Sequence, residues 1–251
     1  MSESLSVARR SSLALLPGIV DEPAKTMSQV AAHPRWRWVL PLVVILAGLA
    51  LSIALSGPLQ VKEAVKQMNE QLQSQLSQVP AEQAEAARAQ VARFTQPIFI
   101  LGASALGRLL ALGLAWVLAA AILYFSGLIV GADLTFGGLF ATVPWAWLPF
   151  ALRDMAQGVF AAITGSLLVN PGLSPLVAQA NMRANAANPV YQILAHIDLF
   201  TAWHLVLIYA ALRGGASLER SKAFWLTVIY AVLSIALRII PGFVSGALLP
   251  G

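Results

Sequence analysis

The sequence predicts an all-α integral membrane protein with five transmembrane helices, and three observations support this fold class. Hydrophobic residues make up 58% of the chain and charged residues 11%, with a mean hydropathy of +0.74. In soluble domains about a quarter of the residues are charged. Residues 38–56 form an uncharged run that is long enough to cross a bilayer, and four more long apolar stretches follow. The composition therefore excludes an ordinary soluble domain.

The apolar stretches divide the chain into a leader, residues 1–37, and a single membrane domain, residues 38–251. The leader is far too long to be the first region of a cleaved signal peptide. The chain contains no cysteine, which excludes disulfides, thiol catalysis and cysteine-bound metals. The five predicted spans cover residues 38–56, 98–130, 136–169, 196–212 and 223–243.

The positions of lysine and arginine predict a cytoplasmic N-terminus. The leader and the loop at residues 213–222 together hold eight basic residues on one side, against five on the other. The net charge of +5 is interpreted as loop charge that faces anionic lipid, not as a nucleic-acid surface. The side with eight contains Arg9, Arg10, Lys25, Arg35, Arg37, Arg213, Arg220 and Lys222, and the other side contains Lys62, Lys66, Arg88, Arg93 and Arg183.

Within the leader, residues 21–34 predict a short amphipathic helix on the inner membrane surface. Asp21 is the expected N-cap, Pro23 lies in the first turn and Pro34 stops the helix. Ile19, Val20, Met27 and Val30 supply a partial apolar face. The alternative is a flexible tail.

Residues 58–97 predict a helical hairpin outside the membrane, between the first two spans. Val61, Val65, Met68 and Leu72 recur at helical spacing, and Pro80 separates this arm from a second one at residues 81–94. The apolar stripe needs a contact, which the other arm, a second subunit or another protein would supply.

Three segments, in this order, resemble the Yip1-domain membrane proteins in their bacterial branch. The leader "GIVDEPAKTMSQVAAHPRWRWVLPLVV" is similar to the family's opening. "FATVP", residues 140–144, is similar to its Tyr-Ala-x-x-Pro. "IDLFTAWHLVLIYAALRGGASLERSKAF", residues 197–224, is similar to its Asp-Leu-Phe-x-x-Trp segment with the following loop. The resemblance covers about residues 18 to 243.

The resemblance implies a five-helix bundle with no known catalytic activity, and we expect it in the bacterial plasma (inner) membrane. Eukaryotic members are tied to membrane traffic and small GTPases, but their Asp-Leu-Tyr-Gly-Pro motif is missing here, which argues against a GTPase partner. Some bacterial members are encoded beside ATP-driven (ABC-type) exporters, which suggests an accessory subunit.

The residues themselves do not indicate an enzyme. The His-Glu-x-x-His spacing of a zinc protease is absent, and His196 and His204 lie too far apart in sequence to chelate as a tight pair. The segment "AITGSLL" has no nearby histidine that would activate its serine, although pairing with a distant one stays open. No phosphate-binding loop with a following lysine is present. We therefore expect no catalytic residue, metal or cofactor.

Charged residues within the spans are the sharper functional clue, because an ionisable group at mid-membrane costs about 2.5–3.5 kcal/mol. Counted from the inner ends of their spans, Arg153, Asp198 and Arg238 lie about 22–26 Å up, in the outer third, and Arg108 lies at the outer surface. One interpretation is lipid-facing arginines and structural ion pairs. The other is a polar cavity, open to the outside, that binds an anion or a lipid headgroup.

Asp198 is expected to pair with Arg238, since both lie at equal depth on neighbouring antiparallel spans. Arg153 is the second candidate, although Asp154 is its immediate neighbour. His196 is then an interfacial residue at the outer mouth, and His204 a buried, hydrogen-bonded residue.

The second span also predicts a helix-packing face, because small residues recur every fourth position. They are Ala103, Gly107, Ala111, Ala115 and Ala119.

These observations predict a non-enzymatic scaffold or accessory subunit that contacts membrane lipids and either other membrane proteins or a second copy of itself. The alternative is a small transporter or a lipid- or anion-binding protein that uses the outer polar cluster. A carrier should show an internal repeat or paired broken helices, and the sequence shows neither.

Overall fold

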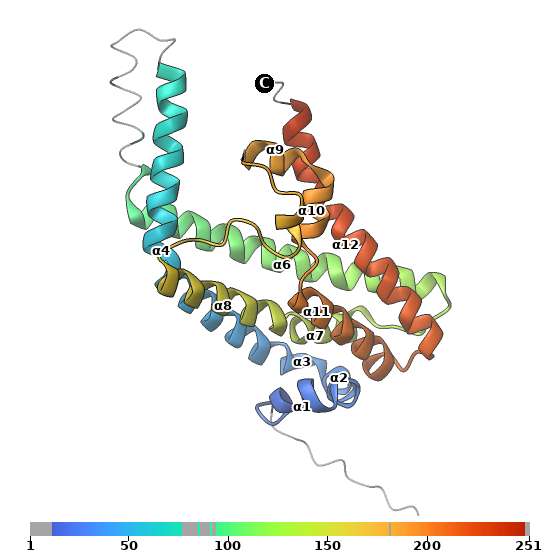
Figure 1. Cartoon of the computed structure of the whole chain (residues 1–251). Coiled ribbons are helices and arrows are strands. Elements are labelled where there is room, and N and C mark those ends of the chain that lie inside the picture. The colour runs from blue at the N-terminus through green and yellow to red at the C-terminus, as the bar shows by residue number, and fades with distance from the viewer. Residues whose placement is uncertain (1–11, 77–84, 86–90, 92–93, 181, 249–251) are drawn as a thin grey trace, which may run out of the picture. The chain divides into compact units, whose positions relative to one another are not determined.

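The computed structural model describes residues 12–76, 85, 91, 94–180 and 182–248, and the regular structure in this part of the chain is helical (Figure 1). The all-α prediction is therefore confirmed. The elements are α1 (Leu15–Asp21), α2 (Pro23–Ala32), α3 (Pro34–Arg37), α4 (Val39–Leu76), α6 (Pro97–Ile129), α7 (Phe136–Ala146), α8 (Leu148–Thr164), η1 (Ser174–Leu176), α9 (Met182–Ala187), α10 (Pro189–Ala195), α11 (Leu199–Ala210), η2 (Ala211–Gly215) and α12 (Arg220–Leu248).

Three stretches of helix are long and apolar enough to cross a membrane: Pro34–Glu70, Pro97–Ile129 and Arg220–Leu237. A fourth candidate is the pair Pro189–Ala195 and Leu199–Gly215, which meet at an angle of 70°. The predicted span at residues 136–169 is divided into α7 and α8 instead of forming one helix. These candidate spans support the prediction that the chain is an integral membrane protein.

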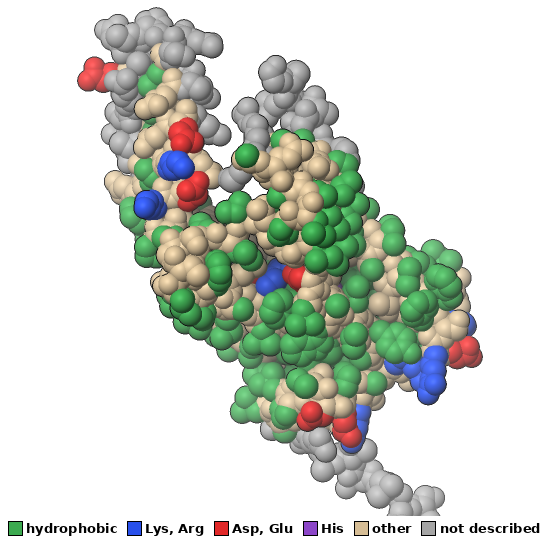
Figure 2. Space-filling view, viewed as in Figure 1, with side chains coloured by type: hydrophobic (Ala, Val, Ile, Leu, Met, Phe, Trp, Pro, Cys, Tyr) green, Lys and Arg blue, Asp and Glu red, His purple; other side chains and the backbone are tan. Residues whose placement is uncertain are grey.

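Hydrophobic side chains cover much of the surface, as expected for helices that face lipid. Figure 2 shows many of them on one face, in patches between polar side chains and backbone. On α6, Leu106, Leu110 and Leu114 are 59%, 66% and 60% exposed. A soluble monomer rarely exposes large contiguous apolar patches.

The helices form two compact units, and α4, α6 and α8 each begin in one and end in the other. The first unit holds residues 1–45, 116–150 and 170–251, and the second holds residues 46–115 and 151–169.

In the second unit, α4 continues through Pro58, so the predicted first span and first hairpin arm are one helix. The stripe residues Val61, Val65, Met68 and Leu72 are all half-buried, but what they contact stays a prediction. The second arm, residues 81–94, lies almost wholly outside the described residues. Helices α4 and α8 pack closely, because a Cβ added at Gly158 would lie 3.0 Å from the Cα of Ser52.

In the first unit, the leader folds onto the rest of the unit through α2. Met27 and Val30 are fully buried there, so the apolar face of α2 contacts protein. The predicted N-cap was wrong: Glu22 precedes the first turn, without a side-chain cap, and Asp21 ends α1. The prediction assumed one helix, whereas Pro23 starts a new one. Contact of the leader with lipid stays a prediction.

A compact segment between α8 and α11 was not predicted, because its helices are too short to show an apolar period. Helices α9 and α10 lie beside α12 (Figure 1). Gly172 has φ +60°, and a Cβ there would lie 2.8–2.9 Å from three carbonyl oxygens at the end of α10. The side chain of Asn185 bonds both backbone groups of Gln179, at 2.7 and 2.8 Å.

Candidate functional site

The segments that carry the family resemblance meet in the first unit, where α2 crosses η2. A Cβ added at Gly214 would collide with the backbone carbonyl of Ala24. At Gly215 it would lie 3.3 Å from the Ala31 side chain and 3.4 Å from that of Thr142. The glycine pair therefore allows α2 to lie directly against the backbone at the end of the fourth predicted span.

A loop was expected at residues 213–222, but its first residues belong to a π-helical turn, η2, which ends at Gly215. Ala216 N–H donates to the Ala211 carbonyl at 3.1 Å, and Leu218 N–H donates to the Leu212 carbonyl at 3.1 Å. The Arg213 guanidinium donates to the carbonyl of Leu218. These bonds fix the path of the chain from α11 into α12.

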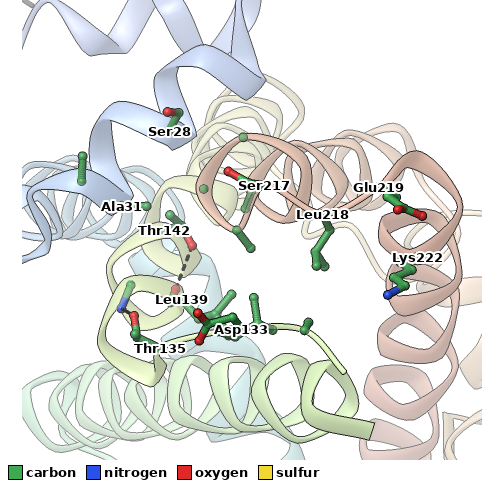
Figure 3. Close-up of a pocket in the computed structure, with 18 of the residues that line it drawn as sticks. Ser28, Ala31, Asp133, Thr135, Leu139, Thr142, Ser217, Leu218, Glu219 and Lys222 are labelled. Carbon is green, nitrogen blue, oxygen red and sulfur yellow. Dashed lines mark hydrogen bonds between the residues drawn. The ribbon is translucent and has the colours of Figure 1, made fainter. Parts of the chain in front are cut away.

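A cavity of about 710 Å³ lies beside this crossing, within the first unit. Figure 3 shows α2, the turn before α7, the start of α7, and the connection from η2 into α12 around it. Its lining includes Ser28, Ala31, Asp133, Thr135, Leu139, Thr142, Gly214, Gly215, Ser217, Leu218, Glu219 and Lys222.

Three charged side chains border this cavity: Asp133, Glu219 and Lys222. All three are exposed, and within the described part of the chain none forms a hydrogen bond or ion pair through its side chain. In Figure 3, Asp133 lies on one side of the open space and Lys222 extends from the other. Charges held apart in this way are available to a ligand.

The hydroxyl groups around the cavity differ in their availability. Thr135 caps α7 by accepting from Gly138 N–H at 3.3 Å, and the Thr142 hydroxyl donates to the Leu139 carbonyl at 2.8 Å. Ser28 and Ser217 are exposed. Among the described residues, no group of three His, Asp or Glu side chains lies close enough to hold a metal ion. The cavity therefore offers hydrogen bonds and charge for binding.

The prediction that His204 is a buried, hydrogen-bonded histidine is confirmed. Its side chain is buried, with Nδ1 2.7 Å from the Ala146 carbonyl and Nε2 2.9 Å from the Tyr230 hydroxyl. Because a carbonyl only accepts, Nδ1 carries the proton, and in the neutral ring Nε2 accepts from Tyr230. The Ala146 carbonyl is available because Phe150 N–H donates to Trp147 instead.

The predicted polar cluster is distributed over both units. In the second unit, Arg153 Nε lies 3.9 Å from Asp154 Oδ1, and Arg108 is exposed on α6. In the first unit, Asp198 is the N-cap of α11, and its Oδ1 accepts from Thr201 N–H at 2.6 Å. The Arg238 side chain lies outside the described residues, so its pairing with Asp198 stays a prediction.

His196 ends α10, with its Nδ1 2.7 Å from the Gln192 carbonyl.

The small-residue face of α6 is only partly covered. Ala103, Gly107 and Ala111 are exposed, and Ala119 is buried. A Cβ added at Gly107 would meet no heavy atom within 4 Å. Ala115 is half-buried. The role of this small-residue face in helix packing stays a prediction.

The cavity-forming segments all fall within a single family match. The model of the Yip1 domain matches residues 18–240, from within α1 to the last predicted span. No curated protein and no solved structure matches the chain. The match covers most of the sequence, and the chain therefore belongs to the Yip1 domain family of membrane proteins.

Proposed function

We propose that this protein is a non-enzymatic membrane scaffold or accessory subunit, and that it contacts another membrane protein at the cavity beside Gly214. One observation carries the proposal: the cavity is lined by the leader, by the turn at residues 131–135 and by the connection at residues 214–219. The family resemblance suggests an ATP-driven exporter as the partner.

We further propose five spans with a cytoplasmic N-terminus in a bacterial inner membrane, and the lining of the cavity supports the number of spans. If the chain crosses the membrane five times, the leader, the turn between the second and third spans, and the connection between the fourth and fifth spans all lie on one side. A common cavity requires this placement. The basic residues of the leader and of the 213–222 loop make that side the cytoplasm.

Cross-linking from the cavity tests this function. The chain has no cysteine, so Ser217→Cys gives a single attachment point for a photo-activated reagent in native membranes. We expect one membrane protein, an exporter subunit, to be cross-linked and to co-purify. Thr164→Cys, exposed in the second unit, is the matched control.

Two outcomes would contradict the proposal. One is the same set of products from positions 217 and 164. The other is modification of the Ser217→Cys variant in intact cells by a thiol reagent that does not cross membranes, because the cavity would then face outward.

The ion pair between Asp198 and Arg238 belongs to the same proposal, as the bond that joins α11 to α12. Asparagine caps helices as well as aspartate does, so Asp198→Asn removes the charge and keeps the cap. We expect Asp198→Asn to lower the free energy of unfolding by about 1 kcal/mol or more. Asp198→Ala should cost about 1 kcal/mol more again, for the lost cap. The measurement is denaturant unfolding in detergent, and an unchanged stability of the asparagine variant would leave only the capping role.

A further inference from the structure

We infer that the cavity beside Gly214 recognises a Lys- or Arg-bearing segment of its partner, of the kind that lies just cytoplasmic of a transmembrane helix. The inference rests on the proposed function for the side of the membrane and for the existence of a partner. The nature of the bound group comes from the charges that line the cavity.

The net charge of the side chains that line the cavity is opposite in sign to that of the surrounding leader and loop. Outside the lining, the leader and the loop at residues 213–222 hold seven basic residues (Arg9, Arg10, Lys25, Arg35, Arg37, Arg213 and Arg220) against three acidic ones (Glu3, Asp21 and Glu22). The lining itself holds two carboxylates, Asp133 and Glu219, against one ammonium group, Lys222. A concave site lined by an excess of one sign concentrates groups of the opposite sign.

These carboxylates are not committed to contacts within the chain. The side chains of Asp133 and Glu219 form no hydrogen bond or ion pair with the described residues. An arginine or lysine that approached them would gain a charge-assisted hydrogen bond without displacing an existing one. The cavity volume of about 710 Å³ lies within the roughly 300–1,000 Å³ of ordinary ligand sites.

The position of the cavity identifies the source of the basic group. Cytoplasmic loops of membrane proteins are enriched in lysine and arginine close to the ends of their spans. Another integral membrane protein would therefore present a basic segment at the depth where Asp133 and Glu219 lie. Lys222, across the cavity from Asp133 in Figure 3, would meet carbonyl or carboxylate oxygens of the same segment.

A protection experiment with the full-length protein in detergent tests this specificity. Ser28→Cys places the only thiol of the chain at the cavity wall, where a neutral maleimide reports its accessibility. The probes are three tripeptides, acetyl-Leu-X-Leu-amide, in which X is arginine, citrulline or glutamate. We expect the arginine peptide to protect this thiol at concentrations about tenfold lower than the citrulline peptide, as for one charge-assisted hydrogen bond.

Matched variants assign the effect to the cavity carboxylates. Asp133→Asn combined with Glu219→Gln should abolish the preference for arginine. Asp21→Asn, which neutralises an exposed carboxylate outside the cavity, should preserve it. Thermal unfolding of each variant verifies that the fold is retained.

Three outcomes would overturn the inference. Equal protection by arginine and citrulline would remove the charge selectivity, while cross-linking at position 217 could still support the proposed function. Stronger protection by the glutamate peptide would make the cavity an anion site built on Lys222. Faster labelling of the thiol at position 28 after deletion of residues 1–11 would identify the chain's own basic segment, with Arg9 and Arg10, as the occupant.

Discussion

Gly214→Ala is expected to destabilise the protein by about 3 kcal/mol, at the upper end of the usual cost of overpacking. The added methyl group would occupy the position of the Ala24 carbonyl. That carbonyl is backbone within α2, so it cannot rotate away as a flexible side chain would. Helix α2 would have to move as a whole, which would expose Met27 and Val30, now fully buried.

Two nearby glycines provide controls for this result in thermal unfolding in detergent. Gly215→Ala meets its nearest atom at 3.3 Å and should cost much less. Gly137→Ala, in the first turn of α7, meets no atom within 4 Å and should be neutral or slightly stabilising. If Gly214→Ala unfolded at the same temperature as Gly137→Ala, the close crossing of α2 and η2 would be wrong.

The sequence predicted the helical class and the leader helix because both depend on local patterns. Hydropathy identified the long apolar helices, and Pro23 marked the start of α2. The burial of His204 was also predicted, because an imidazole in an apolar stretch must bond to something. These inferences needed only the residue and its immediate neighbours.

The cavity could not be predicted, because its wall is assembled from distant segments. Asp133, Glu219 and Lys222 are charged residues beside loops, and in the sequence they resemble ordinary solvated positions. Only the fold brings them to one cavity. The clue that was available was the pair Gly214–Gly215, since adjacent glycines often permit close backbone approach.

Asp198 shows how one carboxylate supports two interpretations. Its depth in a predicted span suggested an ion pair within the membrane, whereas the structure places it at the start of a helix as an N-cap. An aspartate directly before an apolar helix is a recognised start signal. The capping interpretation was therefore available from the sequence, and the two roles are compatible.

His204→Leu is the second substitution from which we expect a large effect, a loss of about 2 kcal/mol or more in the free energy of unfolding. Leucine would leave both the Ala146 carbonyl and the Tyr230 hydroxyl without the ring nitrogens that now satisfy them. A buried carbonyl that loses its donor costs about 1–3 kcal/mol. The ring also packs against Trp147 at 4.5 Å and Phe150 at 4.8 Å between centroids.

A double-mutant cycle with Tyr230→Phe isolates the contribution of the side-chain hydrogen bond. Because His204 and Tyr230 share one bond, the double variant should lose less stability than the sum of the two single variants, by about 0.5–3 kcal/mol. His33→Leu, at an exposed histidine in the leader, should have little effect and controls for the loss of an imidazole. Additive losses would argue against the bond.

The stability of the His204→Leu variant also tests what stabilises the break between α7 and α8. Pro149 lacks the N–H that would continue the helical ladder, and its ring clashes with the carbonyl four residues earlier. The ladder breaks at this point, Phe150 N–H donates to Trp147 and not to Ala146, and His204 on α11 supplies the donor for the Ala146 carbonyl. If His204→Leu is as costly as expected, the break between α7 and α8 is stabilised by α11 and, through Tyr230, by α12. The mutual arrangement of α7, α11 and α12 would then depend on the His204 imidazole.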